Sequence, residues 1–169
     1  MQRRFCLSLL ATTTALGLPG CGFALRRNPL NFAFKSLFSP FAESSTLGAE
    51  FKRLLESGGN VRVISDVRQL EQADVIFDVL QDQREKTVVG INASGQVREF
   101  QLRIRFQFKL RGATGKELIA PVEIRQQRDI AFNESAVLAK EAEEGLLYRE
   151  MQSDIVRQIM RQLAAVTAL

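Results

Sequence analysis

The feature that most constrains the fold is a regular alternation of apolar and polar residues between Val97 and Arg111. Large apolar side chains fill one phase, and from Glu99 onward the other phase holds only polar and charged residues. Because successive side chains of a strand point to opposite faces, one face of this strand is expected to be buried and the other to be in water. Such a pattern is typical of an antiparallel sheet that is covered on one side. The apolar phase consists of Phe100, Leu102, Ile104, Phe106, Phe108 and Leu110.

Further strands are predicted before and after this one in the chain. Residues 73–91 begin with valine and phenylalanine at alternate positions, and two short runs at 32–38 and 61–64 are further candidates. After a glycine-containing turn, residues 118–130 return along the long strand. Pro121 cannot donate a ladder hydrogen bond, so this last strand is expected at a sheet edge or at a bulge.

Two segments have the spacing of amphipathic helices. The first is expected to begin at Ser44 or Ser45, because a serine hydroxyl caps a helix well. It is expected to run to about Leu55 and to stop at the glycines at 58–59. The second covers 133–166, where apolar residues recur at every fourth position. That stripe consists of Leu147, Met151, Ile155, Ile159 and Leu163.

Together these elements predict an α+β fold. Two α-helices are expected to pack on one face of a mixed, mainly antiparallel sheet of four to five strands, which makes a two-layer sandwich. The chain has 169 residues, which is enough for one domain with a sizeable core. We expect a single sandwich domain from 32 to 166.

The N-terminus has the three-part layout of a secretory signal peptide. Two arginines precede an uncharged apolar run between residues 5 and 18, which is shorter than the ~20 apolar residues of a membrane-spanning helix. The run ends in Leu18-Pro19-Gly20-Cys21, which resembles the lipobox of bacterial lipoproteins, although its proline is unusual. The resemblance implies a signal peptide at 1–20, acylation of Cys21, and a tether at 21–31. In the alternative interpretation the protein is simply secreted or membrane-tethered, and this cysteine is incidental.

The residues after the cysteine indicate the membrane to which the protein is delivered. An aspartate directly after the cysteine would resemble an inner-membrane retention signal. Here Gly22 and Phe23 follow Cys21, and neither is an aspartate. Three acyl chains on one residue exceed the two signals that stable anchoring requires. The resemblance therefore implies a lipid-anchored protein of the outer membrane that faces the periplasm.

The composition argues against catalysis and against metal binding. No histidine occurs in the sequence, which removes the usual residue for proton transfer near neutral pH and the commonest metal ligand. Its two cysteines cannot supply the ligands of the usual zinc sites. The sequence contains no GxSxG, Walker, GxGxxG or HExxH motif. We therefore expect neither an enzyme nor a metal or cofactor site.

Basic residues are concentrated in residues 96–128, which hold eight basic and three acidic side chains. Arg103, Arg105 and Lys109 share the polar phase of the alternating strand, so they are expected to form a cationic row on its wet face. Arginine offers a bidentate fork to phosphate and carboxylate groups. The row therefore suits a ligand that carries several such groups.

The same row has a plainer interpretation as a solvated sheet face. Its charges would then pair across strands with Glu99 and Glu123. The pattern alone fits both interpretations. Nucleic acid is not expected as a ligand, because no aromatic side chain shares the basic phase and could stack on bases.

Three stretches of the chain follow one another as in a known family. They are CGFALR at 21–26, GQVREFQL at 95–102, and a helical stretch that begins with AVLAK at 136–140 and ends with QIMRQL at 158–163. In this order they resemble the LPS-assembly lipoprotein LptE family, over nearly all of the chain after Cys21. The resemblance implies a two-layer sandwich without enzymatic activity. It also implies a protein that plugs the LptD β-barrel, helps that barrel to assemble, and binds lipopolysaccharide (LPS) on its way to the cell surface.

The resemblance further implies basic LPS contacts near the Gly-Gln turn and early in the last helix. Lys140 matches the second position, whereas Ala93 stands where an arginine is expected, and Arg98 just past the turn is the candidate replacement. With the cationic row added, the LPS-binding candidates are Lys140, Arg98, Arg103, Arg105 and Lys109. The alternative function is that of a periplasmic lipoprotein that activates or scaffolds another envelope enzyme or transporter.

Overall fold

The computed structural model describes residues 30–169. The predicted signal peptide, the predicted lipidation site Cys21 and most of the predicted tether lie outside the described residues. In chain order, the elements are β1 (Ser36–Phe38), α1 (Thr46–Gly59), β2 (Arg62–Ile64), the 3₁₀ helix η1 (Val67–Gln72), β3 (Val75–Ile91), β4 (Val97–Gly112), β5 (Glu117–Ala131), the 3₁₀ helix η2 (Glu134–Ala136) and α2 (Val137–Ala164). Within 30–169, no helix is both long enough and apolar enough to cross a bilayer.

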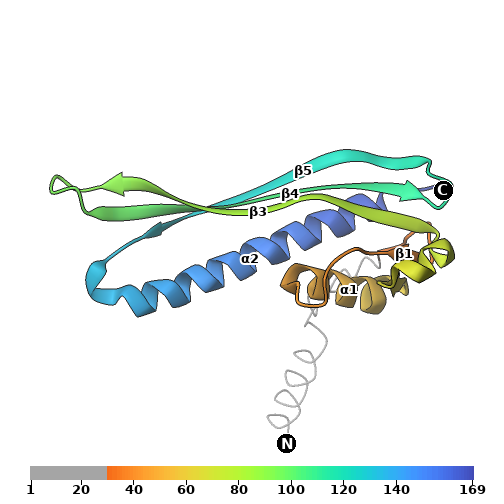
Figure 1. The fold of residues 1–169 in the computed structure, drawn as a ribbon, viewed down its shortest axis with the longest axis horizontal. Helices are drawn as coiled ribbons and strands as arrows, with labels where there is room; N and C mark the ends of the chain where they lie inside the picture. Colours follow the sequence, from red (N-terminus) through yellow and green to blue (C-terminus); the bar gives the residue numbers. More distant parts are fainter. Residues whose placement is uncertain (1–29) are drawn as a thin grey trace, which may run out of the picture.

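The five strands form one mixed sheet in the order β2-β1-β3-β4-β5. Strand β1 runs parallel to β2 and β3, and the long strands β3, β4 and β5 are antiparallel to one another. Both α-helices lie on the same face of this sheet (Figure 1). The predicted α+β two-layer sandwich is therefore confirmed.

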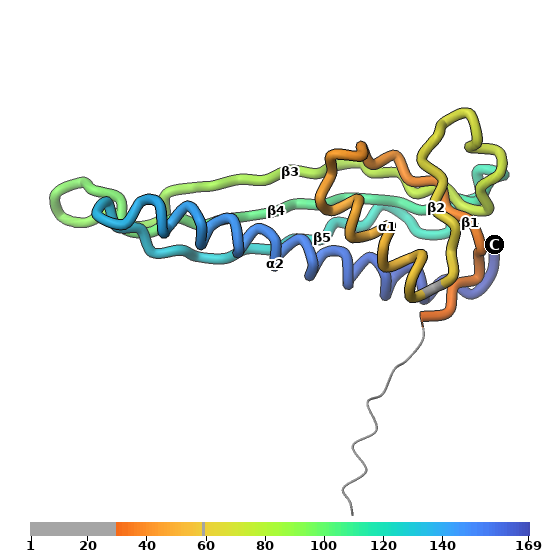
Figure 2. Tube along the Cα trace, turned by 90° about the horizontal axis from the view of Figure 1, so that it is seen from below, coloured from red at the N-terminus to blue at the C-terminus, as the bar shows by residue number. Residues whose placement is uncertain are grey.

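The molecule is elongated along β3, β4, β5 and α2 (Figure 1). We call the end that carries β1, β2 and the C-terminus the proximal end. The opposite end, with the β3–β4 turn and the start of α2, is the distal end. Helix α2 runs along nearly the whole sheet, whereas α1 lies beside it only toward the proximal end (Figure 2). The helical layer is thus two helices wide at one end and one helix wide at the other.

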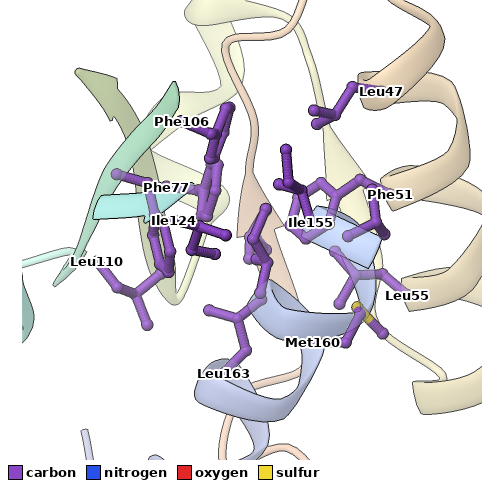
Figure 3. Close-up of a cluster of buried hydrophobic side chains, with 14 of the residues drawn as sticks. Leu47, Phe51, Leu55, Phe77, Phe106, Leu110, Ile124, Ile155, Met160 and Leu163 are labelled. Atoms are coloured by element: carbon purple, nitrogen blue, oxygen red, sulfur yellow. The ribbon is translucent and has the colours of Figure 1, made fainter. Parts of the chain in front are cut away.

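The core fills the space between the helices and the proximal part of the sheet. Leu47 and Phe51 of α1 and Ile155 of α2 point toward Phe77 and Phe106 of the sheet (Figure 3). All five side chains are buried, and the rings of Phe51 and Phe77 are 4.9 Å apart. The apolar phase that the sequence assigned to β4 is this buried face, and the stripe of α2 packs against it.

The opposite face of the sheet is mostly open, with one small exception. At the proximal end, Leu70 of η1 packs against Phe38, Ile64, Ala73 and Ile76 on that face. Strand β1 is therefore buried on both sides, because its Leu37 belongs to the main core. We call the remaining uncovered surface of β3, β4 and β5 the open face.

Strand β5 is the edge strand that Pro121 predicted. Phe108 and Leu110 of β4 pair with Val122 and Ile119 of β5, so two residues of β5 stand opposite one residue of β4. Pro121 lies in this irregular step, where a ladder hydrogen bond is not required. The prediction that this strand lies at an edge or carries a bulge is confirmed, and the structure shows both features.

Strand β3 contains a bulge that the sequence analysis did not predict. Val79 pairs with Phe108 and Gln81 pairs with Gln107, which leaves Leu80 as an extra residue. The bulge reverses the phase of β3, because one inserted residue moves every later side chain to the other face. After the bulge, the β3 residues that pair with the apolar phase of β4 are polar: Asp82, Arg84 and Lys86.

Several predicted boundaries differ from the structure. Helix α1 is capped by Ser45, as expected, whose hydroxyl accepts a 3.0 Å hydrogen bond from the Gly48 N–H. Its end is not set by a glycine, because the left-handed residue is Asn60, with φ 52°. Asn133 caps η2 rather than the long helix, and α2 begins four residues later at Val137.

Asp74 ties the start of β3 to β1. Its carboxylate accepts hydrogen bonds from the N–H groups of Lys35 and Ser36, each 2.9 Å long. The Lys35 N–H is the main cause that holds the pKa of this carboxyl below its ordinary value. The charged form is thus favoured in the folded state. Its contribution to the stability of the fold is complete above the unfolded-state pKa of about 3.9. This contribution is lost as the pH falls through the lower folded-state pKa.

We therefore expect Asp74→Asn to destabilise the protein at pH 7 and to do so progressively less as the pH falls from 5 to 3. Urea denaturation of both proteins across this range measures the difference in free energy of unfolding. A difference that is the same at pH 7 and pH 3 would contradict the role of the charge.

Candidate functional site

A pocket at the distal end lies between the sheet and the start of α2. Its volume is about 250 Å³. It combines an apolar floor with two lysines and two glutamates at its rim, and we call it the end pocket. The lining residues are Lys86, Phe100, Ile130, Ala131, Phe132, Val137, Lys140, Glu141 and Glu144.

The chain reversal after β5 builds the floor of the end pocket. The Phe132 N–H donates a 2.7 Å hydrogen bond to the Arg98 carbonyl, which continues the ladder just past the end of β5. The Phe132 ring then meets Phe100 edge to face, with centroids 5.2 Å apart. Edge-to-face is one of the two favourable arrangements of an aromatic pair, the other being offset stacking. Val137, the first residue of α2, completes the apolar surface.

Lys86 reaches the end pocket because of the Leu80 bulge. Its ammonium group lies 2.6 Å from a Glu144 carboxylate oxygen and 4.4 Å from the centroid of the Phe100 ring. On the helix side, Lys140 contacts Glu143 at 2.9 Å. Each lysine of the end pocket therefore already holds one carboxylate partner.

Tyr148 fixes the spacing between α2 and β3 beside the end pocket. Its hydroxyl donates a 3.1 Å hydrogen bond to the Glu85 carbonyl, and the Arg84 guanidinium lies 5.6 Å from its ring centroid. Burial raises the pKa of the Tyr148 phenol, so this group stays protonated and remains a donor at neutral pH.

The end pocket suits an anionic group attached to an apolar body. Ion pairs at a surface contribute only about 0–1 kcal/mol, so an incoming phosphate can exchange with Glu143 or Glu144 at small cost. The phenylalanine rings and Val137 offer an apolar contact directly below. Its volume is near the lower end of small-molecule sites, which span roughly 300–1,000 Å³, so the end pocket fits one part of a large amphiphile. Among the residues that the structure describes, no cluster of three potential metal ligands occurs.

The structure places the predicted distal residues as follows. Lys140 lines the end pocket. Arg98 is exposed and does not line the end pocket: it is the extra residue of β4 between the pairs Gly90–Glu99 and Ile91–Val97, and its carbonyl accepts the Phe132 N–H. Ala93 is exposed in the turn that the Asn92 side chain closes by accepting from the Ser94 and Gln96 N–H groups.

Lys86 was missed by the sequence analysis. Residues 81–87 are all polar, so they show no alternation that could reveal which of them face the helices. The bulge that turns Lys86 inward is visible only in the pairing of β3 with β4.

The cationic row lies on the open face, on the other side of the sheet from the end pocket. Arg103, Arg105 and Lys109 share one face, as predicted. Their ion-pair partners are on β3: Glu85 contacts both arginines, at 3.4 and 3.9 Å, and Asp78 contacts Lys109 at 3.9 Å. The five LPS-binding candidates therefore do not form a single site.

The plainer interpretation expected Glu99 and Glu123 as the partners of this row, whereas its ion pairs are with Glu85 and Asp78. Glu123 holds Arg125 of its own strand at 2.7 Å, and that guanidinium keeps the pKa of the Glu123 carboxyl below its ordinary value. Glu99 forms no ion pair with the row among the described residues, because it lies opposite Gly90 and Ala131. The β3 bulge moves Glu85 onto the open face and so supplies the carboxylate that the sequence pattern assigned elsewhere.

These features define a class of protein: a two-layer α+β sandwich with a polar open sheet face and an amphiphilic pocket at one end. Residues 34–163 match the LptE family, described as lipopolysaccharide-assembly. The chain belongs to this family, and is thus an LPS-assembly lipoprotein by family.

Known relatives agree with this assignment. The LPS-assembly lipoprotein LptE of Photorhabdus laumondii is 25% identical over 174 residues, which cover 98% of this chain and 88% of that protein. The solution structure of an uncharacterized lipoprotein B from Nitrosomonas europaea is 33% identical, covers 85% of this chain and 91% of that one, and has a TM-score of 0.71. A minor lipoprotein from Acinetobacter baumannii, 21% identical over 79% of this chain and 93% of that one with a TM-score of 0.62, shares the fold.

Proposed function

We propose that this protein binds LPS at the end pocket and plugs the LptD β-barrel, whose assembly it assists. In this proposal it is anchored in the outer membrane by acyl chains on Cys21, faces the periplasm, and performs no catalysis. Family membership supports the connection to LPS assembly. The observation that carries the LPS-binding part is the pair of lysines, Lys86 and Lys140, at the rim of one apolar-floored pocket.

LPS has the chemistry that this pocket recognises, because it joins negatively charged groups to an apolar body. Lys140 and Lys86 supply cations from two different elements, α2 and β3. Phe100 and Phe132 supply the apolar contact. In this proposal Lys86 replaces the basic LPS contact that the family resemblance implies near Ala93.

The first part of the test is LPS retention. We expect Lys140→Asp and Lys86→Asp, alone and together, to reduce the LPS that remains bound to the purified lipoprotein. Each lost charge-assisted contact is worth about 1.5–3 kcal/mol, or roughly a tenfold to hundredfold loss of affinity. The matched control is Lys52→Asp, which reverses an exposed lysine of α1 near the proximal end. Unchanged retention in the double variant would remove LPS binding at the end pocket from the proposal.

The second part of the test is the partner. Purification of the tagged protein from outer membranes is expected to recover the very large barrel protein LptD in equal amount. Recovery of the chain alone, or with a cell-wall synthase, would favour the alternative function of an activator or scaffold.

A further inference from the structure

A groove between the two α-helices is bordered by one arginine from each of them. Helices α1 and α2 lie side by side toward the proximal end (Figure 2), and the groove between them has a volume of about 490 Å³. Sites for small molecules span roughly 300–1,000 Å³, so the groove is large enough to hold a ligand group. Arg53 enters it from α1 and Arg149 from α2. We call it the helix groove.

Hydrogen bonds between the two helices form the bottom of the helix groove. The Gln152 side-chain amide of α2 donates to the Thr46 hydroxyl of α1 at 3.0 Å. The Ser153 hydroxyl of α2 donates to the Glu50 carboxylate of α1, also at 3.0 Å. Gln152 is buried, so its contact holds the two helices at a fixed spacing. Because these polar groups already have partners, a ligand in the helix groove has to be held by the arginines.

The two arginines are available for such a ligand. Both are exposed, and neither forms a side-chain hydrogen bond or an ion pair within residues 30–169. Glu50 is the acidic residue that lines the helix groove with them. The acids on the adjoining turns, Glu56 of α1 and Glu150 of α2, do not line it. The lining residues therefore carry two positive charges and one negative charge.

This set of charges suits one phosphodiester group. A guanidinium presents a planar fork of N–H donors that matches the oxygens of a phosphate. A phosphodiester carries one negative charge, which equals the excess positive charge of the lining residues. A phosphate monoester carries about −1.5 to −2 charges at neutral pH and would bring the additional charge against Glu50. The helix groove therefore favours the phosphodiester, which is the group found in glycerophospholipids.

An apolar stripe on α2 adjoins the helix groove. Leu146 lines a neighbouring hollow of about 400 Å³, which shares Arg149 and Ser153 with the helix groove. Leu138, Ala142 and Leu146 follow one another at every fourth position, so they share one side of α2. All three are exposed, with Leu138 at 82% and Leu146 at 53%. Since the outer side of a surface helix is normally polar, this stripe indicates an apolar ligand.

The stripe has the length of one acyl chain. Arg149 lies eleven residues after Leu138, which is about 16 Å along a helix. The hydrocarbon core of a bilayer is ~30 Å thick, so the acyl chains of one leaflet span about 15 Å. A lipid whose phosphate lies between the two arginines can therefore place one acyl chain along the stripe.

We propose that the helix groove binds an anionic glycerophospholipid. Arg53 and Arg149 hold its phosphodiester, and one of its acyl chains lies along Leu138, Ala142 and Leu146. This site is separate from the end pocket, and the inference goes beyond the proposed function.

The test is isothermal titration calorimetry of the purified lipoprotein with dioctanoyl phosphatidylglycerol. We expect Arg53→Glu and Arg149→Glu each to weaken binding about tenfold or more, because a charge-assisted contact is lost and a like charge then repels the phosphate. The matched control is Arg161→Glu, which reverses an exposed arginine of α2 that does not line the helix groove. This control is expected to bind like the wild-type protein. Unchanged affinity in both groove variants would overturn the proposal.

Two further ligands separate the contributions of charge and acyl chain. Dioctanoyl phosphatidylcholine is expected to bind at least about tenfold more weakly, because its choline cation opposes the arginines. Inorganic phosphate is expected to bind at least about tenfold more weakly as well, because it has no chain to cover the stripe. Equal affinity for phosphatidylglycerol and inorganic phosphate would leave only a site for free anions and overturn the lipid assignment.

LPS retention distinguishes this site from the end pocket. We expect Arg53→Glu to retain as much LPS as the wild-type protein. A parallel loss of LPS and phosphatidylglycerol in this variant would show that the helix groove is part of the LPS site, and would overturn the inference. Unchanged LPS retention in the Lys140 and Lys86 variants would instead overturn the proposed role of the end pocket and leave the helix groove unaffected.

Discussion

Replacement of Phe106 by alanine is expected to lower the free energy of unfolding by about 3–5 kcal/mol. Phe106 is completely buried in the centre of β4, and its ring lies 6.1, 6.4 and 6.2 Å from those of Phe41, Phe77 and Phe108. Its removal leaves a cavity among large rigid rings, which cannot easily collapse into the space. The free energy of unfolding of a small domain is only about 5–15 kcal/mol, so this change removes a large share of the total stability.

Equilibrium urea denaturation of the purified protein measures this loss. The matched control is Gln107→Ala, which truncates the neighbouring residue of β4 on the open face and is expected to change the free energy of unfolding by about 0.5 kcal/mol or less. Similar losses for the two variants would contradict the division of β4 into a buried and a wet face.

The fold was predictable where the sequence pattern is redundant. From Glu99 to Arg111 of β4, the apolar residues face the core and the polar residues face the open side, so one assignment of faces satisfies this whole stretch. The same holds for the stripe of α2, in which Met151, Ile155 and Leu163 are buried as predicted. Pro121 added a local restriction that placed β5 at the edge.

The distal half of β3 was not predictable for the opposite reason. Its residues are nearly all polar, and polar residues tolerate either face. The Leu80 bulge therefore decides which of them point to α2, and its position depends on pairing with β4 over the full hairpin. Glu85 faces the cationic row and Lys86 faces the end pocket as a direct result.

The same limit applies to the candidate sites. Lys140 was identified through family resemblance, because a lone lysine on a helix carries no signal of its own. Arg105 and its neighbours were visible as a row along one strand, but their partner Glu85 depends on the β3–β4 register beyond the Leu80 bulge. Sequence spacing gives the neighbours within a strand, whereas the ion pairs of this row form between strands.

Replacement of Cys21 by alanine is expected to abolish acylation and to prevent delivery to the outer membrane. This prediction follows from the Leu18-Pro19-Gly20-Cys21 sequence, since the thiol of that cysteine is the proposed site of lipid attachment. Each buried acyl CH₂ contributes about 0.8 kcal/mol to membrane binding, so loss of the chains removes the proposed anchor altogether.

Metabolic labelling with radioactive palmitate, followed by separation of inner and outer membranes, measures both effects. We expect Cys21→Ala to carry no label and to accumulate as a precursor that retains residues 1–20, because cleavage before this residue follows its acylation. Cys6→Ala is the matched control, since Cys6 lies within the proposed signal peptide and is removed with it. It is expected to be labelled, cleaved and delivered like the wild-type protein. Palmitate on the Cys21→Ala protein, or its normal arrival in the outer membrane, would show that the anchor lies elsewhere.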